Sequence, residues 1–170
     1  SVGPALDPAT QIGPVVSETQ LKSNLSYVEI ARNEGCEVVS AQHLAERNTG
    51  YFQRPGVFLN ATNQMRTSRE EIFGPVASII KVGDFEEAVA TANDTVFGLS
   101  SAICTSSLYY AREFKRQSEA GMAMVNLPTA GVDYHVPFGG RKNSSYGSRE
   151  QGRAAIDFYT TTKTTYSFAG

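Results

Sequence analysis

The chain has 170 residues, enough for one ordinary domain, and 41% of them are hydrophobic, as in a globular protein with a buried core. Lys and Arg number 15 against 17 Asp and Glu, which gives a net charge of -2 with both signs interspersed along the chain. This balance argues against a protein that binds the phosphate backbone of nucleic acids.

No apolar run reaches the roughly 18 residues of a membrane-spanning helix, and the first residues lack the order of a signal peptide. Cys36 and Cys104 have neither the spacing of a zinc knuckle nor the density of a disulfide scaffold. With only His43 and His135 beside them, we predict no metal site and no membrane contact. The composition favours a cytoplasmic protein with reduced, mostly structural cysteines.

The first half of the chain alternates helix and strand signals. Ser17 and Gln20 form a capping box before apolar residues at helical spacing, so we predict a helix over residues 18–33. Clusters of β-branched and apolar residues predict three strands, at residues 36–40, 57–59 and 76–82. We expect the second to end in a turn at Asn60 and the third to be buried, since it is mostly apolar.

The alternation continues in the second half. Asp84 is expected to cap a helix that runs to Asn93 and Asp94. A strand over 98–105, a helix over 107–119 and a strand over 122–126 follow. This order predicts an α/β fold with an open sheet and parallel stretches. Cys104 would then be a buried and unreactive thiol.

Residues 127–148 are rich in Gly, Pro, Ser and Asn and have no period, which is typical of a functional loop. We predict a short helix over 149–156. The tail, residues 157–168, is rich in Thr and aromatic residues, which favour a strand, but it has few aliphatic residues. It therefore resembles an edge strand that needs a partner.

None of the common phosphate-binding, zinc or hydrolase motifs occurs. Glu70 and Glu71 precede Ile72-Phe73-Gly74, and spacing alone would make them two solvated acids at the start of a strand. The segment 70–76, Glu-Glu-Ile-Phe-Gly-Pro-Val, however, resembles the cofactor-contacting signature of the aldehyde dehydrogenase superfamily. Further segments resemble that family in the same order: Asp7-Pro8 with Gly13-Pro14, Gly50-Tyr51-Phe52 with Pro55, Asn93-Asp94-Thr95 with Phe97-Gly98-Leu99, Ala120-Gly121-Met122 with Val125-Asn126, and Pro137-Phe138-Gly139-Gly140 with Lys142.

The resemblance covers essentially the whole chain. It implies the C-terminal portion of the aldehyde dehydrogenase catalytic domain over residues 1–156, followed by the family's oligomerisation strand over 157–170. Such an enzyme oxidises a small-molecule aldehyde to a carboxylate with NAD or NADP. A cysteine thiolate attacks the aldehyde, hydride passes to the nicotinamide, and a glutamate-activated water hydrolyses the thioester.

In this family the nucleophilic cysteine and the general-base glutamate precede the segment that begins at Asp7. Neither Cys36 nor Cys104 lies in the matching motif, so the resemblance implies no catalytic residue in this chain. The absence of an initiator Met also suggests a piece of a longer protein. We therefore expect the isolated chain to be inactive.

The resemblance assigns three cofactor contacts. Glu71 would accept hydrogen bonds from both hydroxyls of the nicotinamide ribose, a task that suits the two oxygens of a carboxylate. Phe73 would pack near the nicotinamide. Gln20, at the start of its helix, would approach the adenosine side.

The substrate side is assigned in the same way. Phe138 would line the aldehyde pocket, and the substrate-entry loop would include Pro128, Thr129, Ala130 and Gly131.

Segments 127–135 and 139–147 resemble the branch of the family that oxidises α-ketoglutarate semialdehyde (2,5-dioxovalerate). The carboxylate of that substrate needs a cation or backbone N–H groups. Only Arg141 and Lys142 offer permanent charge near this loop. The tail, residues 157–168, would join subunits into a homodimer or homotetramer by edge pairing.

Two other interpretations stay open from the sequence. The chain could be a non-catalytic binding or interaction module on the same half-scaffold, which a longer coding sequence with an upstream Cys and Glu would exclude. Alternatively, Cys104 could be the redox thiol of another oxidoreductase, which predicts a low thiol pKa and ready alkylation.

Overall fold

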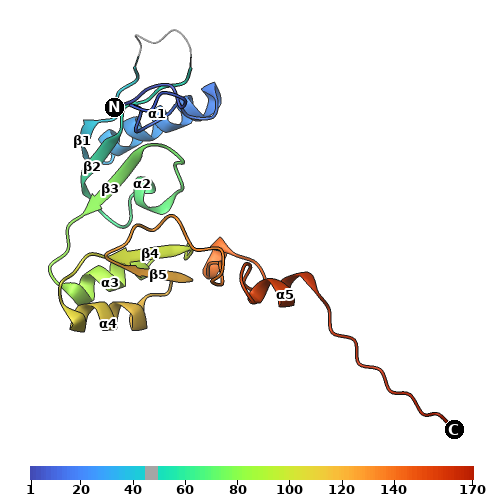
Figure 1. Ribbon diagram of the computed structural model, residues 1–170. Helices are drawn as coiled ribbons and strands as arrows, with labels where there is room; N and C mark the ends of the chain where they lie inside the picture. The colour runs from blue at the N-terminus through green and yellow to red at the C-terminus, as the bar shows by residue number, and fades with distance from the viewer. Residues whose placement is uncertain (45–49) are drawn as a thin grey trace. The chain divides into compact units, whose positions relative to one another are not determined.

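The computed structural model describes residues 1–44 and 50–170. The chain folds into two compact units, Ser1–Gly83 and Asp84–Gly170 (Figure 1). Each unit combines helices with a small open sheet, so the predicted α/β class is confirmed. The strands are divided between two separate sheets.

The first unit contains a three-stranded sheet with the order β1-β2-β3. Its strands are β1 (Glu37–Ser40), β2 (Gly56–Ala61) and β3 (Val76–Ile80). β1 and β2 pair antiparallel, with Glu37 opposite Leu59, whereas β2 and β3 pair parallel, with Gly56 opposite Val76.

The expected end of the second strand at Asn60 was wrong. β2 continues to Ala61 through an irregularity in its pairing with β3. Asn60 has φ +59°, a left-handed conformation that Asn tolerates better than most residues. The positive φ therefore produces a bulge within the strand and does not end it.

The helix α1 (Glu18–Asn33) has the predicted bounds, and the Ser17 hydroxyl accepts a hydrogen bond from the Gln20 N–H at 3.1 Å. Its buried face contributes Val28 and Ala31 to the core of the unit, together with Cys36, Ala41, Phe58 and Ala61. A single helical turn, α2 (Arg66–Arg69), lies before β3 and was not predicted, because four residues are too few to show a period.

The expectation that the third strand is buried was also wrong. Along β3, half-buried residues alternate with exposed ones. Val76 and Ile80 pack against the core, while Ala77 and Ile79 point to the other, exposed face. β3 therefore has the alternating pattern of a strand that is covered on one side only.

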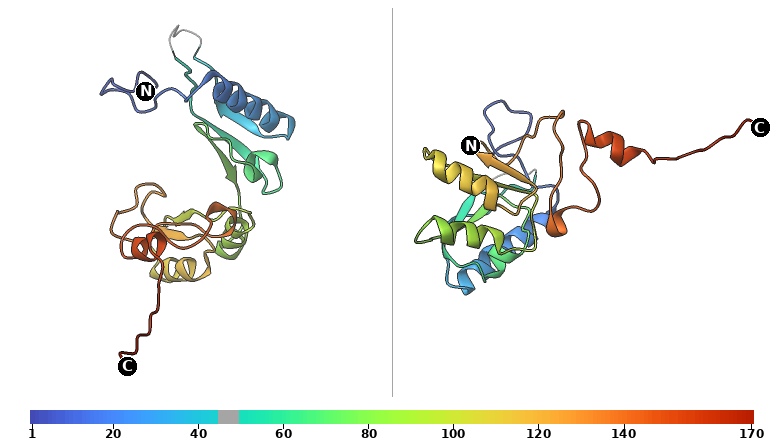
Figure 2. Two further views of the ribbon diagram at one scale, coloured as in Figure 1. Left: turned by 90° about the vertical axis from the view of Figure 1, so that its right-hand side faces the viewer. Right: turned by 90° about the horizontal axis from the view of Figure 1, so that it is seen from below.

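The second unit contains α3 (Phe85–Asn93), β4 (Ser100–Ile103), α4 (Leu108–Gln117) and β5 (Met122–Val125). β4 and β5 are parallel neighbours, with Ser100 opposite Met122. Both helices lie on the same side of this strand pair (Figures 1 and 2). Their bounds agree with the predictions to within two residues.

Three expectations for the second unit need correction. The fourth predicted strand is shorter than expected and ends at Ile103, so Cys104 is exposed and not buried. The last helix is α5 (Ala154–Tyr159) and not 149–156, because Glu150 forms two backbone hydrogen bonds with Phe138, of 2.7 and 2.9 Å.

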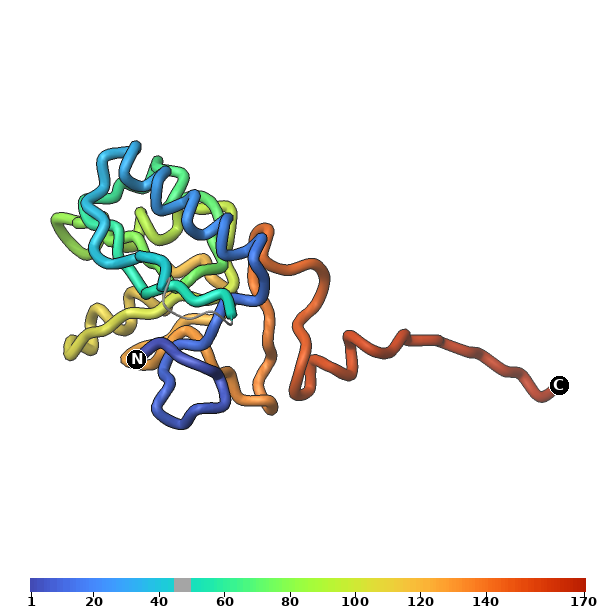
Figure 3. The backbone as a smooth tube through the Cα atoms, turned by 90° about the horizontal axis from the view of Figure 1, so that it is seen from above, coloured from blue at the N-terminus to red at the C-terminus, as the bar shows by residue number. Residues whose placement is uncertain are grey.

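The tail begins with the end of a helix and not with a strand. Asp157–Tyr159 belong to α5, and residues 160–170 run on as an extended, exposed segment that belongs to no sheet of the described chain (Figure 3). Among the described residues, no helix is both long and apolar enough to cross a membrane.

Candidate functional site

An open pocket of about 550 Å³ lies in the first unit, between the N-terminus of α1 and the turn that precedes β3. Its lining residues are Ile12, Gly13, Pro14, Val15, Val16, Gln20, Phe73, Gly74 and Pro75. Two of the three predicted cofactor contacts, Gln20 and Phe73, therefore line one pocket. Segments that lie some 50 residues apart in sequence meet here.

Phe73 has an unusual backbone conformation. Its φ is +54°, and its side chain is 77% exposed. A left-handed conformation costs a residue other than Gly roughly 1–2 kcal/mol. The turn is held from α1, because Gln20 Nε2 donates a hydrogen bond to the Ile72 carbonyl at 2.9 Å. The large aromatic ring is thus presented to the pocket and is not packed in the core.

Glu71, the third predicted cofactor contact, is exposed two residues before Phe73. Its carboxylate makes no hydrogen bond or ion pair with any residue that the structure describes. Both oxygens are therefore available to accept hydrogen bonds from a bound molecule.

The preceding residue, Glu70, is fully engaged. Its carboxylate accepts two hydrogen bonds from the Arg66 guanidinium, both of 2.9 Å, and a third from the Tyr27 hydroxyl at 2.6 Å. These contacts, with Arg66 the larger influence, lower the pKa of Glu70 to about 2. The cluster ties the end of α2 to α1 immediately before Glu71. Sequence analysis missed Tyr27 and Arg66, although the Arg66 and Glu70 spacing of four residues was a signal.

The predicted substrate residues lie in the second unit, where they do not all come together. Phe138 lines a pocket of about 330 Å³ with Leu99, Gly139, Ser144, Ser145, Tyr146, Ser148 and Glu150. Pro128, Thr129, Ala130 and Gly131 are exposed and do not line it.

The two cations near this loop differ in their contacts. Lys142 Nζ forms an ion pair of 2.6 Å with Glu119 and donates hydrogen bonds to the carbonyls of Asn93 and Thr95. Arg141 is exposed, and its guanidinium has no ion-pair partner in the described part of the chain. Arg141 is therefore the cation that is free to bind an anionic ligand.

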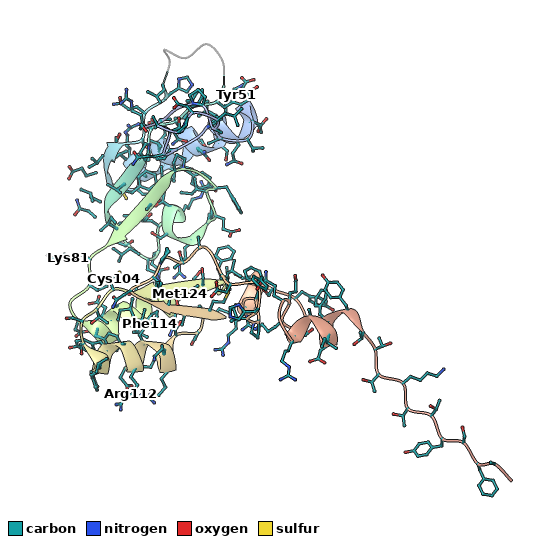
Figure 4. The ribbon with its side chains drawn as sticks, viewed as in Figure 1. Tyr51, Lys81, Cys104, Arg112, Phe114 and Met124 are labelled. Carbon is teal, nitrogen blue, oxygen red and sulfur yellow. The ribbon has the colours of Figure 1, made fainter. Side chains whose placement is uncertain are left out.

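The two cysteines also differ. Cys36 is buried in the first unit, and burial raises the pKa of its thiol. Cys104 is exposed after β4 (Figure 4). Within residues 1–44 and 50–170, no three His, Cys, Asp or Glu side chains come together as metal ligands would.

A comparison of the sequence with protein families matches residues 1–165 to the aldehyde dehydrogenase family. The chain belongs to the aldehyde dehydrogenase family. Its curated relatives include an α-ketoglutarate semialdehyde dehydrogenase of Haloferax volcanii, 46% identical over 97% of this chain. An α-ketoglutaric semialdehyde dehydrogenase of Bacillus subtilis is 41% identical over 98% of this chain.

The chain spans about a third of the length of those relatives, 35% in both cases. Among solved structures, it is similar to an indole-3-acetaldehyde dehydrogenase in complex with NAD+, with a TM-score of 0.90 and 37% identity. That match covers 97% of this chain and 33% of the other. The family resemblance inferred from the short motifs is thereby confirmed.

Proposed function

We propose that this chain forms part of the cofactor site and part of the substrate site of an NAD(P)-dependent aldehyde dehydrogenase. The observation that carries the proposal is the exposed carboxylate of Glu71, which has no partner among the described residues, beside the exposed ring of Phe73 at a pocket. The NAD+ complex of a structural relative supports the choice of cofactor.

The residues present fit a nicotinamide nucleoside. Glu71 accepts hydrogen bonds from the two vicinal ribose hydroxyls, because one carboxylate offers two acceptor oxygens. Phe73 packs its ring against the nicotinamide end and limits the access of water to it. When bound, the cofactor supplies the acceptor for hydride from the aldehyde carbon. Gln20 lines the same pocket and borders the adenosine side.

The aldehyde in this proposal is α-ketoglutarate semialdehyde. Two relatives that bear this substrate in their names are 46% and 41% identical to the chain. Arg141 offers a free cation to the substrate carboxylate, whereas Lys142 is already paired with Glu119. Phe138 lines the aldehyde pocket in this proposal, and Pro128, Thr129, Ala130 and Gly131 belong to the exposed substrate-entry loop.

The nucleophilic cysteine in this proposal belongs to sequence outside the chain. Cys36 is unsuited to the task, because burial raises the pKa of its thiol and so disfavours the reactive thiolate. The longer enzyme acts in the cytoplasm as a homodimer or homotetramer. Its subunits join through the extended tail, whose exposed aromatic residues Tyr166 and Phe168 have no cover within the described chain.

The test is the variant Glu71→Gln in the complete enzyme. Loss of the charge should weaken NAD+ binding about tenfold, since hydrogen bonds to a charged group are worth roughly 1.5–3 kcal/mol. The dissociation constant is measured by calorimetry, with Glu37→Gln, an exposed change on β1, as the control. An unchanged dissociation constant in Glu71→Gln would refute the cofactor role of this segment.

A further inference from the structure

Behind the Phe73 turn, the first unit buries two amide side chains that the proposed chemistry does not use. Asn24 of α1 is 0% exposed, and Gln53, in the segment before β2, is 1% exposed. The two amides approach each other to 3.1 Å. Asn24 Oδ1 in turn lies 2.7 Å from Nε2 of Gln20. Three amides thus lead from the pocket into the interior of the unit.

The cluster contacts the backbone of the turn. Gln20 Nε2 lies 2.9 Å from the Ile72 carbonyl oxygen and 3.5 Å from that of Phe73. When the Asn24 amide is turned over, its nitrogen donates to the Ile72 carbonyl at 3.0 Å. In the turned-over orientation Asn24 therefore bonds directly to the residue before Phe73, and in the other orientation it reaches the same carbonyl through the Gln20 amide.

Gly74 packs directly against the same side chain. A Cβ atom at this position would lie 2.6 Å from both Cγ and Nδ2 of Asn24, which is closer than real Cβ atoms approach their neighbours. The turn therefore rests on the Asn24 amide with no room for a methyl group. Hydrogen bonds from one side and van der Waals contact from the other define its position.

This arrangement has a cost for the fold. Gln53 Nε2 is buried and makes no hydrogen bond with the described residues. Apolar side chains of similar size would fill the same space without an unpaired donor. Stability alone therefore does not explain two buried amides here. Support for the strained turn at Phe73 does explain them, because a left-handed backbone conformation persists only where the surrounding residues hold it.

We propose that Asn24 and Gln53 are positioning residues for the cofactor. Gln53 supports Asn24, Asn24 supports the Gln20 amide and the turn, and the turn keeps Phe73 left-handed with its ring at the pocket. This inference rests on the proposed function, because it assigns Phe73 and Glu71 to the cofactor. It adds that their geometry is set before the cofactor binds.

The experiment uses Asn24→Leu and Gln53→Met in the complete enzyme, since both changes roughly preserve volume and remove the amide. Hydrogen–deuterium exchange of residues 72–76 in the cofactor-free enzyme should become faster in both variants. The NAD+ dissociation constant should rise at least about fivefold, while kcat at saturating NAD+ and KM for the aldehyde stay within about twofold.

The matched control is Val89→Ala in α3, a change to a buried apolar residue of the second unit. Val89 is buried, and it belongs neither to the core cluster against which Ile72 and Val76 pack nor to the pocket of the turn. It should lower the melting temperature without changing exchange at 72–76 or NAD+ affinity. If one amide variant does not fold, the other still decides the result.

Two results would overturn the inference. One is unchanged exchange and unchanged NAD+ affinity in a folded amide variant while Glu71→Gln still weakens binding, which leaves the proposed function intact. The other is an equal loss of NAD+ affinity in Val89→Ala, which would make the amides merely structural. If Glu71→Gln itself leaves binding unchanged, the proposed function fails and the positioning role fails with it.

Discussion

Glu70 and Glu71 are neighbours in the sequence, but their carboxylates have different surroundings. Glu70 is held by Arg66 and Tyr27, whereas Glu71 has no partner in the described structure. The contacts of Glu70 with Arg66 and Tyr27 fix the backbone at this point. The carboxylate of Glu71 beside it remains available to a ligand.

Glu70 should contribute to stability in a pH-dependent way. Its pKa is about 2 in the folded chain against an ordinary 4.5, so the ionised form is favoured by folding. This contribution is complete above pH 4.5 and is lost as the pH falls towards 2. We expect Glu70→Gln to flatten the fall in the free energy of unfolding across this window, as measured by urea denaturation. Glu37→Gln should keep the wild-type slope, and an equal slope in all three proteins would contradict the prediction.

The two thiols should react at different rates. Iodoacetamide should label exposed Cys104 well before Cys36, which is buried and has a raised thiol pKa. Peptide mass spectrometry of the native and the urea-unfolded protein measures both rates. If native Cys104 reacts no faster than in the unfolded chain, it is an ordinary surface thiol. A much faster native reaction would support the redox interpretation of Cys104.

At the scale of elements, the start of β5 is packed closely against segment 139–140. A Cβ atom on Gly121 would lie 2.1 Å from the Gly139 carbonyl oxygen and 2.6 Å from Gly140 Cα. Gly121→Ala should therefore push β5 away from the segment that follows Phe138 and lower the free energy of unfolding by about 1–3 kcal/mol.

Thermal unfolding of Gly121→Ala is best compared with that of Gly147→Ala. Gly147 has φ +83° and no neighbouring atom within 4 Å, so only conformational strain opposes its replacement. Gly147→Ala should therefore lower the free energy of unfolding by less, about 1 kcal/mol. If both variants lose the same free energy of unfolding, the close approach at Gly121 adds nothing to the cost of its replacement.

Helices with local signals could be predicted well. Ser17, Asp84 and Ser107 each accept a hydrogen bond from an N–H three residues later, and α1, α3 and α4 begin where these caps indicate. Contacts distant in sequence were not predictable. The pairing of Phe138 with Glu150 moved the last helix to Ala154–Tyr159.

The same limit applies to the site. Glu71, Phe73 and Gln20 could be proposed because short motifs resemble a known family. The link between Asn24 and Gln53 could not, because no period or motif connects two amides 29 residues apart on different segments. Only the fold brings them together.

At the scale of the whole molecule, the chain corresponds to about a third of its curated relatives, and the proposal assigns the nucleophile to another part. The purified 170-residue chain should therefore show no aldehyde-dependent formation of NADH. Absorbance of NADH measures this, with intact mass spectrometry to identify the protein as it is expressed. Turnover by the short chain that Cys104→Ser abolishes would instead assign the nucleophile to this chain.

The contact between Gly74 and Asn24 also restricts how this segment can diverge among related sequences. A side chain at position 74 is excluded unless position 24 first becomes smaller, so glycine should be retained there. Replacing only one of Asn24 and Gln53 by an apolar residue leaves the other amide buried without its neighbour. An alignment should therefore show positions 24 and 53 changing together, both polar or both apolar, as a coupled pair in the history of the family.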